Sequence, residues 1–197
     1  MPLWGNTDAD ESKPKWLTTA EKKEVYANAE GWVVEAGSTM TGNDNTSADP
    51  EILVAIGELA TSIGSADITE IEFISTAFDV SAGGTIQVRA RFNEEVDVDT
   101  SGGVPFLAIT NGNQGTGSGR GPHNAAYSSG TGTNELVFAI TIGAAAGSIA
   151  ADDVLVVGAN AINLNSGTIK DAGTSTNATI TNVEAIGTAA GSITAVA

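Results

Sequence analysis

Residues 84–96 read GTIQVRARFNEEV, and this stretch decides the class of fold that the sequence predicts. Apolar and polar side chains alternate along it. The apolar ones are Ile86, Val88, Ala90 and Phe92, and the polar ones between and after them are Gln87, Arg89, Arg91 and Asn93. Successive side chains of a strand point to opposite faces of a sheet, so this period of two predicts an antiparallel strand with one buried face.

Further short apolar runs surround this stretch, with turns rich in Gly, Asn and Ser between them. They are EIEFISTAF, VPFLAIT, NELVFAITI, DVLVVG, GTIKD, ATITNVEAI and SITAVA. Pro105 fits the first residue of a strand, where no ladder donor is needed. This spacing of short strands predicts an all-β protein in which residues 66–197 form a β-sandwich.

The chain before residue 66 has a different pattern. Thr18 and Glu21 fit a capping box, which predicts a short helix that Gly31 ends, although VYANAEGWVV also suits an extended chain. GWVVEAG and EILVAIGEL flank the turn-forming insert STMTGNDNTSADP, as in a β-hairpin. We therefore expect an N-terminal arm over residues 1–34 and a β-hairpin module over residues 35–65.

Composition limits the function classes. The formal net charge of −16 argues against nucleic-acid binding, which needs clustered Lys and Arg. There is no Cys, so thiolate metal sites and a Cys nucleophile are excluded. No run approaches the ~18 apolar residues of a membrane helix, and MPLWGNTDADESK lacks the pattern of a secretory leader. We expect a soluble protein with no membrane partner.

Cations and tryptophans gather at one end of this acidic chain. Residues 1–30 hold four basic and six acidic residues, a net charge of −2, whereas residues 31–197 carry the remaining −14. Large aromatic and basic side chains are typical anchors of protein interfaces. The predicted partner-binding residues are Trp4, Lys13, Lys15, Trp16, Lys22, Lys23, Tyr26 and Trp32. The alternative is that Trp16, Tyr26 and Trp32 cover an end of the β domain.

Candidate catalytic groups are sparse. His123 is the only histidine, and no serine is placed with two triad partners in a familiar order. The glycines between Gly112 and Gly121 lack the Gly-Lys-Ser/Thr of a phosphate loop, which favours a surface loop. We expect no enzyme activity and no cofactor.

Calcium is the one metal ion for which the acidic residues offer suitable ligands. Calcium prefers six to eight oxygen ligands, several of them from carboxylates. The acidic residues that bear on it are Glu94, Glu95, Asp97, Asp99, Asp152, Asp153 and Asp171. They show no EF-hand spacing, and alternation places Asp97 and Asp99 on a solvated strand face.

Three phrases resemble a bacterial immunoglobulin-like domain. They are FNEEVDVDTSGGVPFLAIT, AYSSGTGTNELVFAITI and IAADDVLVVGANAINLNSGTIKDAGTSTNATIT, and the similarity spans about residues 66–184. The loop NGNQGTGSGRGPHN at residues 111–124 is longer and richer in Gly than a plain hairpin of such domains. The resemblance implies an immunoglobulin-like β-sandwich.

The opening segment resembles a narrower group. PLWGN, PKWL, GWVVEAG and EILVAIGEL are similar to the start of virion structural proteins from tailed phages of marine bacteria, particularly of cyanobacteria. That resemblance implies a capsid decoration or cement protein on the particle surface, with the major capsid protein or another virion protein as partner. A tail or fibre component and a fragment of a bacterial surface adhesin are the alternatives. A homo-oligomer on the particle and a host-surface glycan as ligand stay open.

Overall fold

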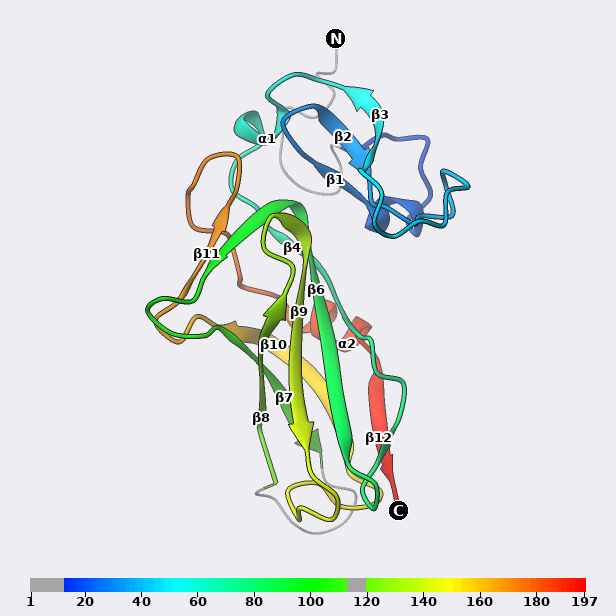
Figure 1. The fold of residues 1–197 in the computed structure, drawn as a ribbon, viewed down its shortest axis with the longest axis vertical. Helices are drawn as coiled ribbons and strands as arrows, with labels where there is room; N and C mark the ends of the chain where they lie inside the picture. The colour runs from blue at the N-terminus through cyan, green and yellow to red at the C-terminus, as the bar shows by residue number, and fades with distance from the viewer. Residues whose placement is uncertain (1–12, 113–119) are drawn as a thin grey trace.

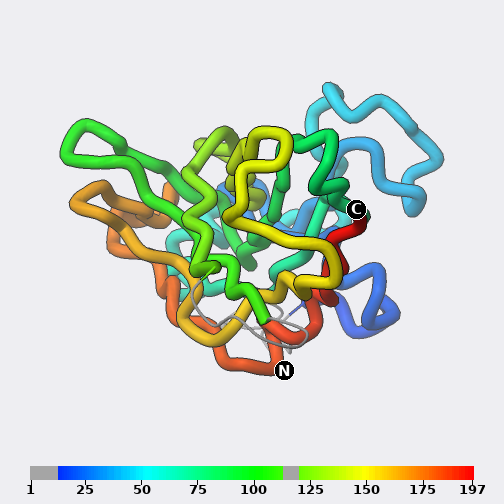
Figure 2. The backbone as a smooth tube through the Cα atoms, turned by 90° about the horizontal axis from the view of Figure 1, so that it is seen from below, coloured from blue at the N-terminus to red at the C-terminus, as the bar shows by residue number. Residues whose placement is uncertain are grey.

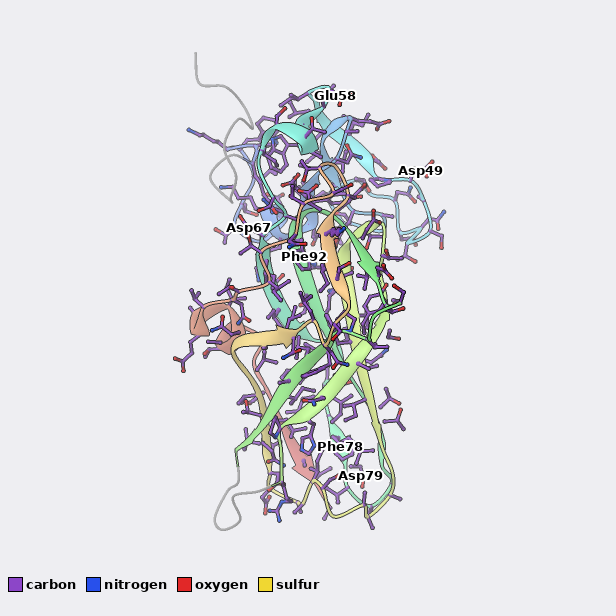
Figure 3. All side chains as sticks on the ribbon, turned by 90° about the vertical axis from the view of Figure 1, so that its left-hand side faces the viewer. Asp49, Glu58, Asp67, Phe78, Asp79 and Phe92 are labelled. Carbon is purple, nitrogen blue, oxygen red and sulfur yellow. The ribbon has the colours of Figure 1, made fainter. Side chains whose placement is uncertain are left out.

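The structure, a computed structural model, describes residues 13–112 and 120–197. It is elongated, with two bodies stacked along the long axis (Figure 1). We name residues 13–63 the N-terminal module and residues 66–197 the sheet body. Side chains mark the two ends in Figure 3: Asp49 and Glu58 lie in the N-terminal module, and Phe78 and Asp79 lie near the opposite end of the sheet body.

The N-terminal module is built on three short strands. Its elements are the 3-10 helix η1 (Glu21–Glu24), β1 (Val25–Ala27), β2 (Gly31–Val34), β3 (Glu51–Ala55) and α1 (Leu59–Ser62). Strand β2 pairs antiparallel with both β1 and β3. A small apolar core of its own holds the module together, and Trp32, Leu59 and Ile63 belong to it.

The predicted antiparallel pairing of GWVVEAG with EILVAIGEL is confirmed by β2 and β3. The expected capping contacts also form: the Thr18 N–H donates to Glu21 Oε2 at 2.7 Å, and the Glu21 N–H donates to Thr18 Oγ1 at 3.3 Å. The helix after them is a single 3-10 turn, and the chain then becomes extended as β1. The expected arm and hairpin therefore share one sheet, because β2 lies between β1 and β3.

The sheet body has β6 (Gly84–Asp99) as its longest strand. The other elements are β4 (Ile68–Phe73), β5 (Phe78–Asp79), β7 (Phe106–Gly112), β8 (His123–Ser129), β9 (Thr133–Ile142), β10 (Val154–Asn163), β11 (Thr168–Asp171), α2 (Glu184–Ala189) and β12 (Ser192–Val196). The strands run in the order β6-β9-β8-β7-β10-β12-β5, and β4 and β11 also pair with β6. The predicted all-β class is confirmed. Seen along the long axis, the loop at residues 35–50 projects beyond the sheet body (Figure 2).

Strand β6 explains why the two bodies meet where they do. Its apolar face is fully buried in the core of the sheet body, as the alternation predicts, with Phe92 at 1% exposure. Its polar face is buried as well near residues 91–94, where the N-terminal module covers it. Ala27 of β1 pairs in parallel with Glu94 at this point. Near residues 91–94 the outer face of this strand is therefore an interface within the chain rather than a solvated surface.

One predicted strand is wrong in part. The run ATITNVEAI was expected to be extended, but helix α2 begins within it at Glu184. The buried side chain of Asn182 accepts a hydrogen bond from the Ala161 N–H and donates one to the Gly158 carbonyl, both at 2.9 Å. These contacts reach β10 where its pairing with β7 is interrupted between Val157 and Ile162, and the chain then enters α2 instead of continuing as a strand.

Candidate functional site

The predicted partner-binding residues separate into two groups by burial. Trp4 lies outside the described residues. Lys13 is 1% exposed, and its ammonium group donates to the Lys22 carbonyl at 2.7 Å. Tyr26 and Trp32 are buried, and Trp32 belongs to the apolar core of the N-terminal module. In this conformation these three side chains pack within the chain, and their contact with a partner stays a prediction.

The other predicted residues remain at the surface. Trp16 is 61% exposed, and Lys15 next to it is also exposed. Lys22 is half-buried, and Lys23 forms an ion pair with Glu70 of the sheet body. The surface that a partner can reach therefore centres on Lys15 and Trp16.

An open cleft of about 650 Å³ lies between the N-terminal module and the sheet body. One wall comes from η1, β1 and the loop after β2, and includes Glu24, Tyr26 and Glu35. The facing wall comes from β6 and β9, and includes Arg91 and Glu135. Titratable side chains from both bodies therefore meet in this cleft.

Arg91 is at the centre of these side chains. Its guanidinium donates to Glu70 at 3.0 Å, to Glu35 at 3.1 Å and to Glu135. The side chain is 9% exposed, so the ion pairs are largely screened from water. Arg89, two residues earlier on the same face, donates to Glu72 at 2.7 Å and to Glu135 at 3.1 Å. We call these six residues with Lys23 the junction cluster.

The junction cluster shifts the acid strengths of its members in opposite directions. Burial and the neighbouring charge of Glu135 raise the pKa of Glu35 to about 7, against the lowering effect of Arg91. Burial acts on Glu135 too, but hydrogen bonding from Arg91 outweighs it and lowers that pKa. The pKa of Glu70 is lowered because Lys23 and Arg91 outweigh its burial. Burial, with Glu95 and Glu35 nearby, raises the pKa of Tyr26.

Sequence reasoning missed the junction cluster. Arg89 and Arg91 were placed on a solvated strand face, and Glu35 and Glu135 were not singled out. The available signal was the pair of arginines itself: two of the chain's eight basic residues occupy one face of one strand in an otherwise acidic domain. What the sequence did not show was that a second body covers this face.

A second polar cluster lies in the sheet body around Asp153, which is fully buried. Its carboxylate accepts hydrogen bonds from Arg120 at 2.8 and 2.9 Å and from Asn111 at 2.9 Å. Hydrogen bonding from Arg120 lowers the pKa of Asp153 to about 2. His123 lies 3.4 Å from the Asn111 amide, and burial lowers its pKa. This cluster ties Arg120 to β7 and to the start of β10.

Comparisons with protein-family models, with curated proteins and with solved structures find no match to this chain. Within residues 13–112 and 120–197, no helix has the length and apolar character needed to cross a membrane. The same residues contain no group of three or more His, Cys, Asp or Glu side chains placed to hold a metal ion.

Proposed function

We propose that the chain is a non-enzymatic structural protein of a phage particle. It decorates the outer shell, docks on a shell protein through the N-terminal module, and holds an immunoglobulin-like sheet body away from the shell. The resemblance of the opening segment to phage virion proteins supports the class of protein. The exposure of Trp16 beside Lys15, both in the N-terminal module, is the observation that supports docking through that module.

The chemistry of this module suits a protein partner. A tryptophan adds a large contact area with few rotamers, and such residues dominate the binding energy of many interfaces. Trp16 lies on the short segment before η1, and Leu17 next to it is buried in the module's core. The exposed indole is therefore presented from a fixed backbone, which lowers the entropy lost on binding. Lys15 adds a positive charge that favours an acidic surface on the partner.

The charge distribution supports an outward position for the sheet body. The sheet body, residues 66–197, holds 13 acidic and four basic residues, a net charge of −9. Many copies of so acidic a surface repel one another and stay apart when they are held on a common shell. The repulsion also opposes aggregation of free copies before they bind.

Co-sedimentation with shells stripped of this protein tests the proposal. We expect Trp16→Ser to weaken binding by about tenfold or more, as removal of an interface anchor does. Ile74→Ser is the matched control, because Ile74 is an apolar side chain of the sheet body that is 42% exposed. Equal binding by wild type and Trp16→Ser would contradict docking through this module.

Antibody labelling of intact particles tests the location. Labelling over the whole shell is expected for a decoration protein. Labelling confined to the tail would replace the shell proposal by the tail or fibre alternative.

A further inference from the structure

Polar contacts join the two bodies, and each body has an apolar core of its own. The core of the N-terminal module ends at Ile63, and the core of the sheet body begins at Ala66. Only Gly64 and Ser65 connect them, and Gly64 has a φ of +109°. Contacts of this kind between bodies of one chain, polar rather than apolar, favour relative motion.

Two ion pairs cross the junction in opposite directions. Lys23 of the N-terminal module contacts Glu70 of the sheet body, and Arg91 of the sheet body contacts Glu35 of the N-terminal module. The strand pairing between the bodies is limited to the Ala27–Glu94 bridge. Charge contacts therefore carry much of the attachment.

Carboxylates outnumber cations at this junction. The groups around Glu35 are Glu70 and Glu72 on β4, Arg89, Arg91 and Glu95 on β6, Glu135 on β9, Lys23 and Glu24 on η1, and Tyr26 on β1. With Glu35 included, six carboxylates face three cations, a net charge of −3 when all are ionised. Glu35 Oε2 is buried with no hydrogen-bond partner among the described residues, and Glu135 competes for the same guanidinium. A proton on Glu35 removes one of the surplus charges.

We propose that this junction is a pH-dependent hinge in which a proton held by Glu35 keeps the N-terminal module seated on the sheet body. When that proton is lost, Glu35 and Glu135 repel each other across the cleft. The seated arrangement then gives way to a range of angles between the two bodies. The hinge does not depend on what the protein docks to.

The direction of the pH effect follows from the pKa values. The pKa of Glu35 is raised in the seated state from 4.5 to about 7, so its protonated form favours seating. The stabilisation of the seated state by Glu35 is complete below about pH 4.5 and is lost as the pH rises through about 7. The pKa values of Glu70 and Glu135 are lowered, so their contributions are present above 4.5 and are lost at more acidic pH. Seating is therefore strongest near pH 4.5 and weakens as the pH rises toward 7.

Distance measurements between two spin labels test the hinge in the full chain. The chain has no Cys, so Ser47→Cys in the N-terminal module and Thr100→Cys in the sheet body give two unique label sites, both exposed. We expect a narrow distance distribution at about pH 5 and a broader one at about pH 8.5, because the contribution of Glu35 is lost as the pH rises through about 7. An unchanged distribution over this range overturns the hinge.

Two matched variants identify the group responsible. Glu35→Gln keeps the shape of the side chain without its charge. Its distance distribution is expected to stay narrow at both pH values. Glu51→Gln makes the same change at an exposed position of β3 and is expected to broaden as wild type does. If Glu35→Gln broadens like wild type, Glu35 is not the switch.

Carbon-13 NMR of the Glu35 carboxyl group in the wild-type chain gives a measurement that does not depend on any variant. A carboxyl midpoint near 7 supports the hinge, and one near 4.5 overturns it.

Discussion

Arg91→Met is expected to destabilise the protein strongly, because Arg91 is the side chain that three junction carboxylates share. Its guanidinium contacts Glu35, Glu70 and Glu135, and the side chain is 9% exposed. Methionine keeps much of the length but leaves these carboxylates without that cation. Removing one partner from a buried ion pair costs about 3–5 kcal/mol. Since domains unfold with a free energy of about 5–15 kcal/mol, this loss is a large fraction of the total.

Urea unfolding followed by circular dichroism measures this loss. Lys170→Met is the control, because Lys170 is exposed on β11 and the same change there is expected to stay within about 0.5 kcal/mol. Removing Arg91 also raises the pKa of the carboxylates it contacts, so they take up protons more readily. The loss of unfolding free energy in Arg91→Met, relative to wild type, is therefore expected to be largest above neutral pH and to shrink as the pH falls toward 5. A deficit below about 1 kcal/mol that does not change with pH would refute the role given to Arg91.

Three other substitutions test separate parts of the molecule. Trp32→Ala removes the largest side chain of the N-terminal core and is expected to cost about 3–5 kcal/mol; hydrogen exchange should show the loss in residues 13–63 while the sheet body stays protected. Arg120→Ala is expected to raise the pKa of Asp153 from about 2, measured by carboxyl NMR titration. In the wild type, Asp153 stabilises the fold fully above pH 3.8, and this stabilisation is lost as the pH falls through about 2. In Arg120→Ala the loss should occur at a less acidic pH. Gly31→Ala places a Cβ 2.0 Å from the Val54 carbonyl oxygen at a φ of +142°, so a lower melting temperature is expected. An unchanged melting temperature would mean that β2 and β3 can move apart at this position.

Local patterns in the sequence predicted much of the sheet body. The alternation around Phe92 marked the buried face of β6, because every second side chain of a strand points to the same face of the sheet. The Thr18–Glu21 contacts and the pairing of β2 with β3 were likewise local signals. The first two patterns each lie within one short stretch, and the third consists of two apolar runs on either side of a turn-forming insert.

Contacts between distant segments were not predicted. Arg91 has the sequence pattern of a solvated strand residue, but it is buried and donates a hydrogen bond to Glu35 of the N-terminal module, 56 residues away. Trp32 and Tyr26 looked like interface anchors because the short strands around them gave no sign of a core. The start of α2 depends on Asn182 binding the backbone of β10, 21 residues earlier in the chain at Ala161.

Photo-crosslinking on the shell tests most directly which end of the molecule docks. A photoreactive residue at Thr19, three residues after Trp16, reports on the N-terminal module, and one at Ala144 reports on the turn after β9 at the other end of the sheet body (Figure 1). Both positions are exposed. We predict crosslinks to a shell protein from position 19 and none from position 144. Crosslinks from position 144 without any from position 19 would show that the sheet body docks and that the N-terminal module points outward.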